Sequence, residues 1–171
     1  MPENAVSAVC GRLREHLAHA ISATLLSVLL CGLPWPCLGQ DGAMKHERIA
    51  NSMEQATRSA IDKFNDAFNR HDADSLAAFL TDDTVFEDTS PAPDGRRIEG
   101  KAAVVEFWRG WFSRNADAHF EAEEVIVSGN RAVVPWVYRK MRNGQPWHIR
   151  GVDIFTVRDG KIAAKLAYVK G

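Results

Sequence analysis

The sequence has few cysteines and no excess of charge of either sign. Cys10, Cys31 and Cys37 all lie within the first forty residues, so the rest of the chain has no thiol. Disulfides, thiolate nucleophiles and cysteine-based zinc sites are therefore excluded from that remainder. The formal net charge of -1 leaves no basic surplus of the kind that binds a phosphate backbone, so we expect no nucleic-acid partner.

The N-terminal segment is predicted to be a secretory signal peptide. Arg12 and Arg14 precede an apolar run over residues 20–33, and the small residues Cys37 and Gly39 suit a cleavage site. The run is shorter than the roughly 18 to 20 residues that cross a bilayer, so we expect no stable membrane insertion after cleavage.

These features predict three parts of the chain. Residues 1–39 are the expected signal peptide, 40–45 a short linker and 46–171 the folded domain. The product is then secreted or periplasmic. If translation starts at Met44 instead, the same domain is cytoplasmic.

Hydrophobic periodicity divides the domain into helices followed by strands. Apolar residues three or four positions apart predict helices near residues 49–70 and 102–113, with a short helix capped by Asp72 between them. Alternating patterns separated by Gly-Asn, Asn-Gly and Asp-Gly turns predict an antiparallel meander. Three helices followed by such strands indicate an α+β domain. The expected strands are 84–88, 120–127, 131–141, 146–157 and 161–169.

Three segments together carry a family resemblance. They are residues 69–74 (NRHDAD) leading to 81–88 (TDDTVFED), Gly100 before the third helix, and residues 150–162 (RGVDIFTVRDGKI). In this order they resemble the SnoaL-like polyketide cyclases and the ketosteroid-isomerase-like proteins of the nuclear transport factor 2 superfamily, over about residues 46–171.

The resemblance implies an α+β fold of a particular shape. Three N-terminal helices would pack in the concave face of a curved antiparallel sheet, forming a cone-shaped half-barrel whose open end is an apolar pocket. The superfamily contains isomerases, cyclases, epoxide hydrolases, dehydratases and proteins without catalysis, so the fold alone does not assign a reaction.

Asp88 is the first catalytic candidate. The resemblance places it where steroid isomerases have a proton-shuttling Asp, and a carboxylate at the mouth of an apolar pocket is a better base near neutral pH because its charged form is disfavoured. An Asp followed by Thr89, Ser90 and Pro91 also commonly ends a strand and caps a turn, so both roles stay open.

The second candidate pair is Arg150 and Asp153. The isomerase oxyanion hole uses a Tyr and a protonated Asp, but the resemblance puts Phe64 and Arg150 at those positions. It also places the face of His148 and Arg150 toward the pocket, where Arg150 would stabilise an enolate or a carboxylate. Asp153 alternates to the other face, as an acid or base or as part of a salt bridge at the sheet surface or a subunit interface.

The aromatic residues predict either a core or a pocket for a small, flat hydrophobic molecule. No histidine pairs with a carboxylate at metal-ligand spacing, so we expect no metal, and no cofactor is indicated. The expected ligand-binding residues are Phe64, Phe86, Trp108, Trp136, Tyr138 and His148.

Two classes of function follow. The first is a cofactor-independent isomerase, lyase or cyclase that uses an Asp base on a carbonyl compound. The alternative is a non-catalytic small-molecule-binding protein or a dimeric interaction module. We also expect a homodimer through an outer apolar sheet face containing Ile149, Phe155 and Val157, because three helices cover only one side of the sheet.

Overall fold

The computed structural model describes residues 40–170, and the side chains from residue 42 onward. The predicted signal peptide and all three cysteines lie outside the described residues. Residues 40–45, expected to be a linker, are instead the first residues of a helix. Among the described residues, no helix has both the length and the apolar character needed to cross a membrane.

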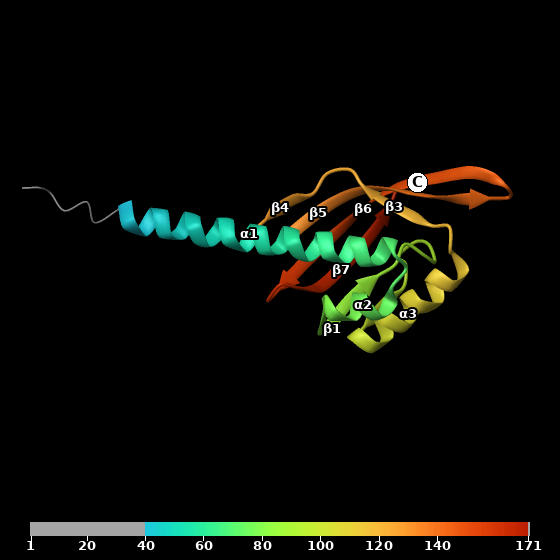
Figure 1. Ribbon diagram of the computed structural model, residues 1–171, viewed down its shortest axis with the longest axis horizontal. Helices are drawn as coiled ribbons and strands as arrows, with labels where there is room; N and C mark the ends of the chain where they lie inside the picture. The colour runs from blue at the N-terminus through green and yellow to red at the C-terminus, as the bar shows by residue number, and fades with distance from the viewer. Residues whose placement is uncertain (1–39, 171) are drawn as a thin grey trace, which may run out of the picture. The chain divides into compact units, whose positions relative to one another are not determined.

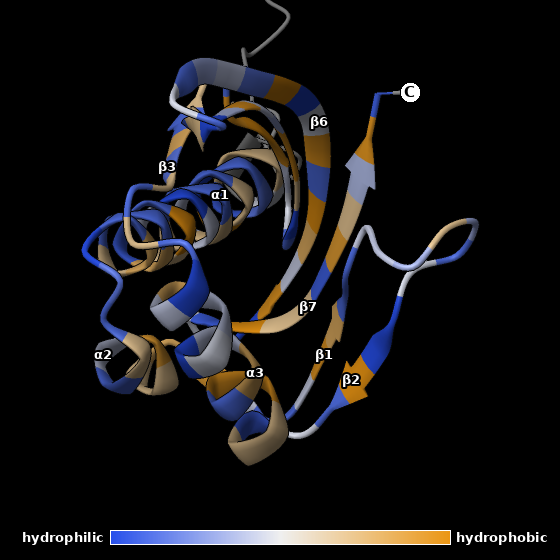
Figure 2. Cartoon of the chain, turned by 90° about the vertical axis from the view of Figure 1, so that its right-hand side faces the viewer, coloured by the Kyte–Doolittle hydropathy of each residue, from blue (hydrophilic) through white to orange (hydrophobic). Residues whose placement is uncertain are grey.

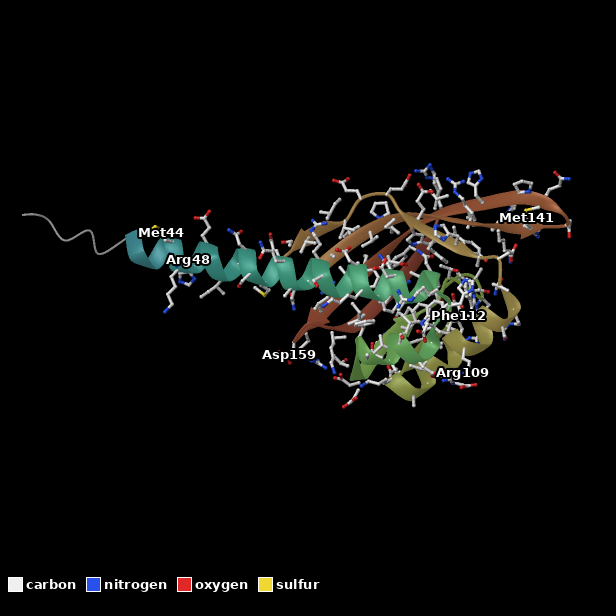
Figure 3. The ribbon with its side chains drawn as sticks, viewed as in Figure 1. Met44, Arg48, Arg109, Phe112, Met141 and Asp159 are labelled. Carbon is white, nitrogen blue, oxygen red and sulfur yellow. The ribbon has the colours of Figure 1, made fainter. Side chains whose placement is uncertain are left out.

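Three helices pack against one side of a seven-stranded sheet (Figure 1). The helices are α1 (Gln40–Asn69), α2 (Ala73–Ala78) and α3 (Lys101–Arg114). The N-terminal turns of α1, including Met44 and Arg48, extend past the end of the sheet (Figure 3). The strands are β1 (Leu80–Glu87), β2 (Arg97–Glu99), β3 (His119–Ala122), β4 (Ile126–Ser128), β5 (Arg131–Arg142), β6 (Gln145–Arg158) and β7 (Lys161–Val169).

Local sequence signals account for the boundaries of several elements. The Asp72 carboxylate accepts a hydrogen bond from the Ser75 N–H at 2.9 Å, so the predicted cap of α2 is confirmed. Asn143 and Asp159 have positive φ angles and each precedes a glycine that also does, which suits the tight turns of the β5–β6 and β6–β7 hairpins.

The sheet is mixed, which corrects the expected antiparallel arrangement. Its strand order is β2-β1-β7-β6-β5-β3, with β4 also paired to β5, and β1 runs parallel to β7. The sheet curves around the helices (Figure 2). Register shifts interrupt the β1–β7 and β6–β7 pairings, and irregular pairing of this kind bends a strand.

A break replaces the single strand predicted over residues 120–127. Ala122 pairs with Trp136 and Ile126 with Val133, so three residues between them face only Val134 and Pro135. Proline has no N–H to donate to a neighbouring strand, and the carbonyl of Pro135 accepts one bond from Glu123. The chain therefore forms two short strands, β3 and β4.

The concave face of the sheet and the helices bury one continuous core. Phe64 and Ile61 of α1, Leu76 of α2 and Phe155 of β6 are almost wholly buried within it. Phe155 and Val157 belong to this core, so the prediction that they form an outer apolar face is wrong. The convex face carries other apolar residues, where Val133, Ile154 and Leu166 lie side by side across β5, β6 and β7.

Candidate functional site

A pocket of about 270 Å³ opens between α3 and the concave face of the sheet. A cavity of about 20 Å³, roughly the size of one water molecule, lies next to it. The two share Phe120, Trp136, Asp153 and Lys165. The larger pocket is lined by Phe86, Asp88, Thr89, Trp108, Trp111, Asn115, Phe120, Trp136, Tyr138, Lys140, Trp147, Ile149, Asp153, Lys165, Ala167 and Val169.

Aromatic rings form a large part of the pocket wall. The ring of Phe120 stacks on Tyr138 with centroids 4.8 Å apart and meets Trp136 edge to face at 5.1 Å. On the other side, Trp108 packs on Phe86 at 4.6 Å. Such surfaces suit a flat, largely apolar ligand.

Gly151 lets Trp136 lie directly on β6. A Cβ atom placed at Gly151 would fall 2.2 Å from Cζ2 of Trp136 and 2.3 Å from the backbone oxygen of Tyr168. Any side chain at this position would therefore displace either the indole or a neighbouring strand. The absence of a side chain at Gly151 thus determines the shape of the pocket wall.

A buried ion pair lies where the two cavities meet. Lys165 Nζ is 2.7 Å from Oδ2 of Asp153, and the two side chains are only 10% and 7% exposed. Among the lysines that the structure describes, Lys165 is the only buried one. Its ammonium also lies 5.3–5.8 Å from the ring centroids of Phe86, Trp108 and Phe155, within range of cation–π attraction.

Three buried polar atoms near this pair have no hydrogen-bond partner within the described part of the chain. They are Oδ1 of Asp153 and the indole nitrogens of Trp108 and Trp136. An unpaired buried donor or acceptor costs free energy, which a ligand or water can recover by bonding to it. All three belong to residues that line the larger pocket, and protein atoms cover the polar atoms themselves.

Asp88 lies at another part of the same pocket, directly after β1. Burial raises the pKa of its carboxyl above the ordinary value, while the Thr89 N–H, Arg96 and Lys165 oppose that rise. The Thr89 N–H donates to Oδ1 at 2.8 Å. Asp88 is therefore both a candidate proton acceptor and a residue that orders the following turn.

Polar groups at the end of α3 form part of the pocket rim. Lys140 Nζ donates to Oδ1 of Asn115 at 3.0 Å, and the Tyr138 hydroxyl lies 3.4 Å from the same oxygen. Burial, aided by the negative charge of Asp117, raises the pKa of Tyr138 to about 12. The Tyr138 hydroxyl is therefore protonated at neutral pH.

The structure does not bring Arg150 or His148 into the pocket. Both side chains are exposed, and Arg150 pairs with Glu123 on the convex face. The prediction that their face lines the pocket is wrong, because the opposite alternation, through Ile149, Asp153 and Phe155, points inward. That alternation also places Asp153 inside, not at the sheet surface or a subunit interface.

The predicted aromatic residues have two different positions. Phe86, Trp108, Trp136 and Tyr138 line the larger pocket. Phe64 is only 1% exposed and borders the small inner cavity instead. No group of three or more His, Cys, Asp or Glu side chains in residues 42–170 is placed to hold a metal ion.

Sequence reasoning missed Lys165. A signal was present, since Lys165 is the one charged residue inside the apolar stretch IAAKLAYV of β7. Recognising its partner required the β6–β7 register, which places Asp153 opposite Ala167, two residues along from Lys165.

Comparisons with known proteins agree with this architecture. The family model for the SnoaL-like domain matches residues 61–165. An NTF2-like protein of unknown function from Mesorhizobium loti is 35% identical, with a TM-score of 0.61 over 69% of this chain and 93% of that protein. No curated protein sequence gives a significant match.

Two further solved structures carry functional names. A candidate polyketide cyclase from Sinorhizobium meliloti is 26% identical, with a TM-score of 0.53 over 63% of this chain and 92% of that one. An LEH-like epoxide hydrolase from M. tuberculosis shares the fold at 20% identity, with a TM-score of 0.57 over 68% of this chain and 84% of that one.

Proposed function

This chain belongs to the SnoaL-like family, and we propose that it binds a small, flat, largely apolar carbonyl compound and catalyses proton transfer on it without a cofactor. The reaction class is that of an isomerase, lyase or cyclase. The observation that carries the proposal is the aromatic pocket, with Asp88 and the Asp153–Lys165 pair among its lining residues.

Asp88 is the proposed base. Its raised pKa makes the carboxylate a stronger proton acceptor than an exposed Asp. Abstraction of a proton next to a carbonyl produces an enolate, whose oxygen needs a donor or a positive charge nearby. Lys165, which lines the same pocket, is the candidate for that role.

The test combines binding with isotope exchange. Tryptophan fluorescence quenching by β-tetralone measures binding, and NMR in heavy water measures exchange of its α-protons. Asp88→Asn should still quench but should lose about two to four orders of magnitude of exchange rate. Glu87→Gln is the matched control, since Glu87 pairs with Arg97 outside the pocket.

A non-catalytic binding protein is the second candidate. The hydrogen bond from Thr89 to Asp88 favours it, because that bond gives the carboxylate a structural use. Quenching without exchange in the wild type, together with a lowered melting temperature in Asp88→Asn, would favour binding alone. Exchange that survives in Asp88→Asn but not in Asp153→Asn would move the base to Asp153.

A homodimer through the convex face is also part of the proposal. Val133 and Tyr168 are exposed there, beside Ile154 and Leu166. Apolar residues grouped on an exposed sheet face favour pairing with a second copy. Light scattering at tens of micromolar should give the dimer mass, and Ile154→Lys should give the monomer mass without loss of folding.

A further inference from the structure

We propose that Lys165 forms a covalent imine with the carbonyl group of a bound aldehyde or unhindered ketone. The inference rests on the proposed function, because it assumes that the ligand of this pocket is a carbonyl compound. It adds a reactive residue and a chemical step to that function.

Lys165 lies where a bound ligand can reach it. Its side chain borders both cavities, so a ligand in the larger pocket meets it directly. The side chain is 10% exposed and surrounded by aromatic rings, so little bulk water surrounds the amine. A lysine removed from water in an apolar pocket is one of the ways in which proteins produce a nucleophilic amine.

Asp153 is positioned to accept the proton that the amine must lose. Its Oδ2 is 2.7 Å from Lys165 Nζ, and its Oδ1 has no partner among the described residues. Among residues 42–170, only Lys165 therefore hydrogen-bonds to the carboxylate. Transfer of one proton from Lys165 to Asp153 leaves Nζ with a free lone pair.

The chemical step balances with these two residues alone. After proton transfer, the Nζ lone pair attacks the carbonyl carbon, the carbonyl π bond opens, and the oxygen takes the proton from Asp153 to give a carbinolamine. A second proton passes from nitrogen through Asp153 to the hydroxyl, and the C–O bond breaks to release water as the C=N bond forms. The product is a protonated imine, so the net charge beside Asp153 is unchanged.

Because the charge is conserved, the surroundings of the ammonium also suit the product. The protonated imine occupies the place of the ammonium, so Asp153 and the faces of Phe86 and Trp108 stabilise it as they stabilise Lys165. The imine also acts as an electron sink for loss of a proton from the adjacent carbon. Covalent capture would therefore assist the proton transfer assigned to Asp88.

Reductive trapping at neutral pH tests the inference. Wild-type protein is mixed with naphthaldehyde and sodium cyanoborohydride, and mass spectrometry locates any naphthylmethyl group. Ordinary exposed lysines are almost wholly protonated at neutral pH and react slowly. Apart from the N-terminal α-amine, which is also partly unprotonated near neutral pH, we expect one group per chain, on Lys165. That group should be lost in Lys165→Arg, which keeps the charge but not the nucleophile.

Lys101→Arg is the matched control, since Lys101 pairs with Asp82 and lines neither cavity. It should leave the labelling unchanged. Methylnaphthalene, which has the same shape but no carbonyl, should quench tryptophan fluorescence and protect Lys165 in the wild type. This protection tests the assignment even if Lys165→Arg fails to fold.

The two proposals fail in different ways. Quenching by both probes with no adduct on Lys165, or with adducts spread equally over exposed lysines, would overturn the imine and leave the pocket's ligand class intact. Absence of quenching by either probe, together with absence of an adduct, would overturn both proposals.

Discussion

The two faces of the sheet each hold an ion pair, and the two pairs have opposite surroundings. On the concave face, Asp153 and Lys165 are 7% and 10% exposed and lie among aromatic rings. On the convex face, Glu123 and Arg150 are 37% and 53% exposed. Water screens the convex pair and solvates either partner if the other is removed. In the concave pair, a residue that loses its partner has little water to replace it.

The comparison shows why charge chemistry alone misassigned the site. Arg150 looks like a ligand-binding cation in the sequence, yet it faces solvent. Lys165 lies in an apolar stretch, yet it is a buried cation that lines the pocket. Burial and direction, more than residue type, decide which charged group is available to a ligand.

Breaking the concave pair should have the largest effect on stability. Lys165→Met leaves Asp153 buried without its partner, and loss of about 3–5 kcal/mol in the free energy of unfolding is expected, measured by urea denaturation. The double variant Asp153→Leu with Lys165→Met should recover most of that loss, because neither charge then remains buried. A double variant no more stable than the single one would show that the pair is not coupled.

Adding a side chain at Gly151 should have the next largest effect on stability. Gly151→Ala places a methyl group against Trp136 and the backbone of Tyr168, and overpacking of this kind costs about 1–3 kcal/mol. Tryptophan emission should change and quenching by aromatic ketones should weaken. Gly42→Ala, where nothing lies within 4 Å, is the control and should not reduce stability.

Replacing Asp88 should have a smaller effect on the free energy of unfolding, and that effect should depend on pH. Its pKa is raised above the ordinary value of 3.8, so the folded chain holds the proton more tightly than the unfolded chain. The contribution of Asp88 to stability therefore falls as pH rises from that value through the folded pKa. Asp88→Asn lacks this term, so its stability relative to wild type should increase over the same interval and stay constant below it.

Urea unfolding at a series of pH values measures that difference. Glu87→Gln is the control for removing a carboxylate from the same segment of the chain. A difference that falls with rising pH would mean that the pKa of Asp88 is lowered, contrary to its burial.

Breaking the convex pair should have the smallest effect. Arg150→Ala should change the free energy of unfolding by about 1 kcal/mol or less, because an exposed ion pair contributes little. Ligand quenching should be unchanged, since Arg150 faces away from the pocket. Weakened binding in this variant would return Arg150 to the site.

Part of this architecture follows from local patterns that the sequence contains by itself. The spacing of apolar residues predicts α1 and α3, the cap at Asp72 predicts α2, and the Asn143-Gly144 and Asp159-Gly160 turns predict two hairpins. These features depend on neighbours a few residues apart, so a linear reading detects them. The same alternation correctly placed Asp153 on the face opposite Arg150.

The tertiary structure alone decided which face of the sheet is inside and which distant residues meet. The parallel pairing of β1 with β7 joins segments about eighty residues apart, which no turn signal specifies. The break between β3 and β4 depends on Pro135 in another strand. The Asp153–Lys165 pair likewise requires the β6–β7 register and the aromatic wall from α3 and β1. Burial is what distinguishes this ion pair from an exposed one. Burial depends on how the whole chain packs, so no local pattern in the sequence predicts it.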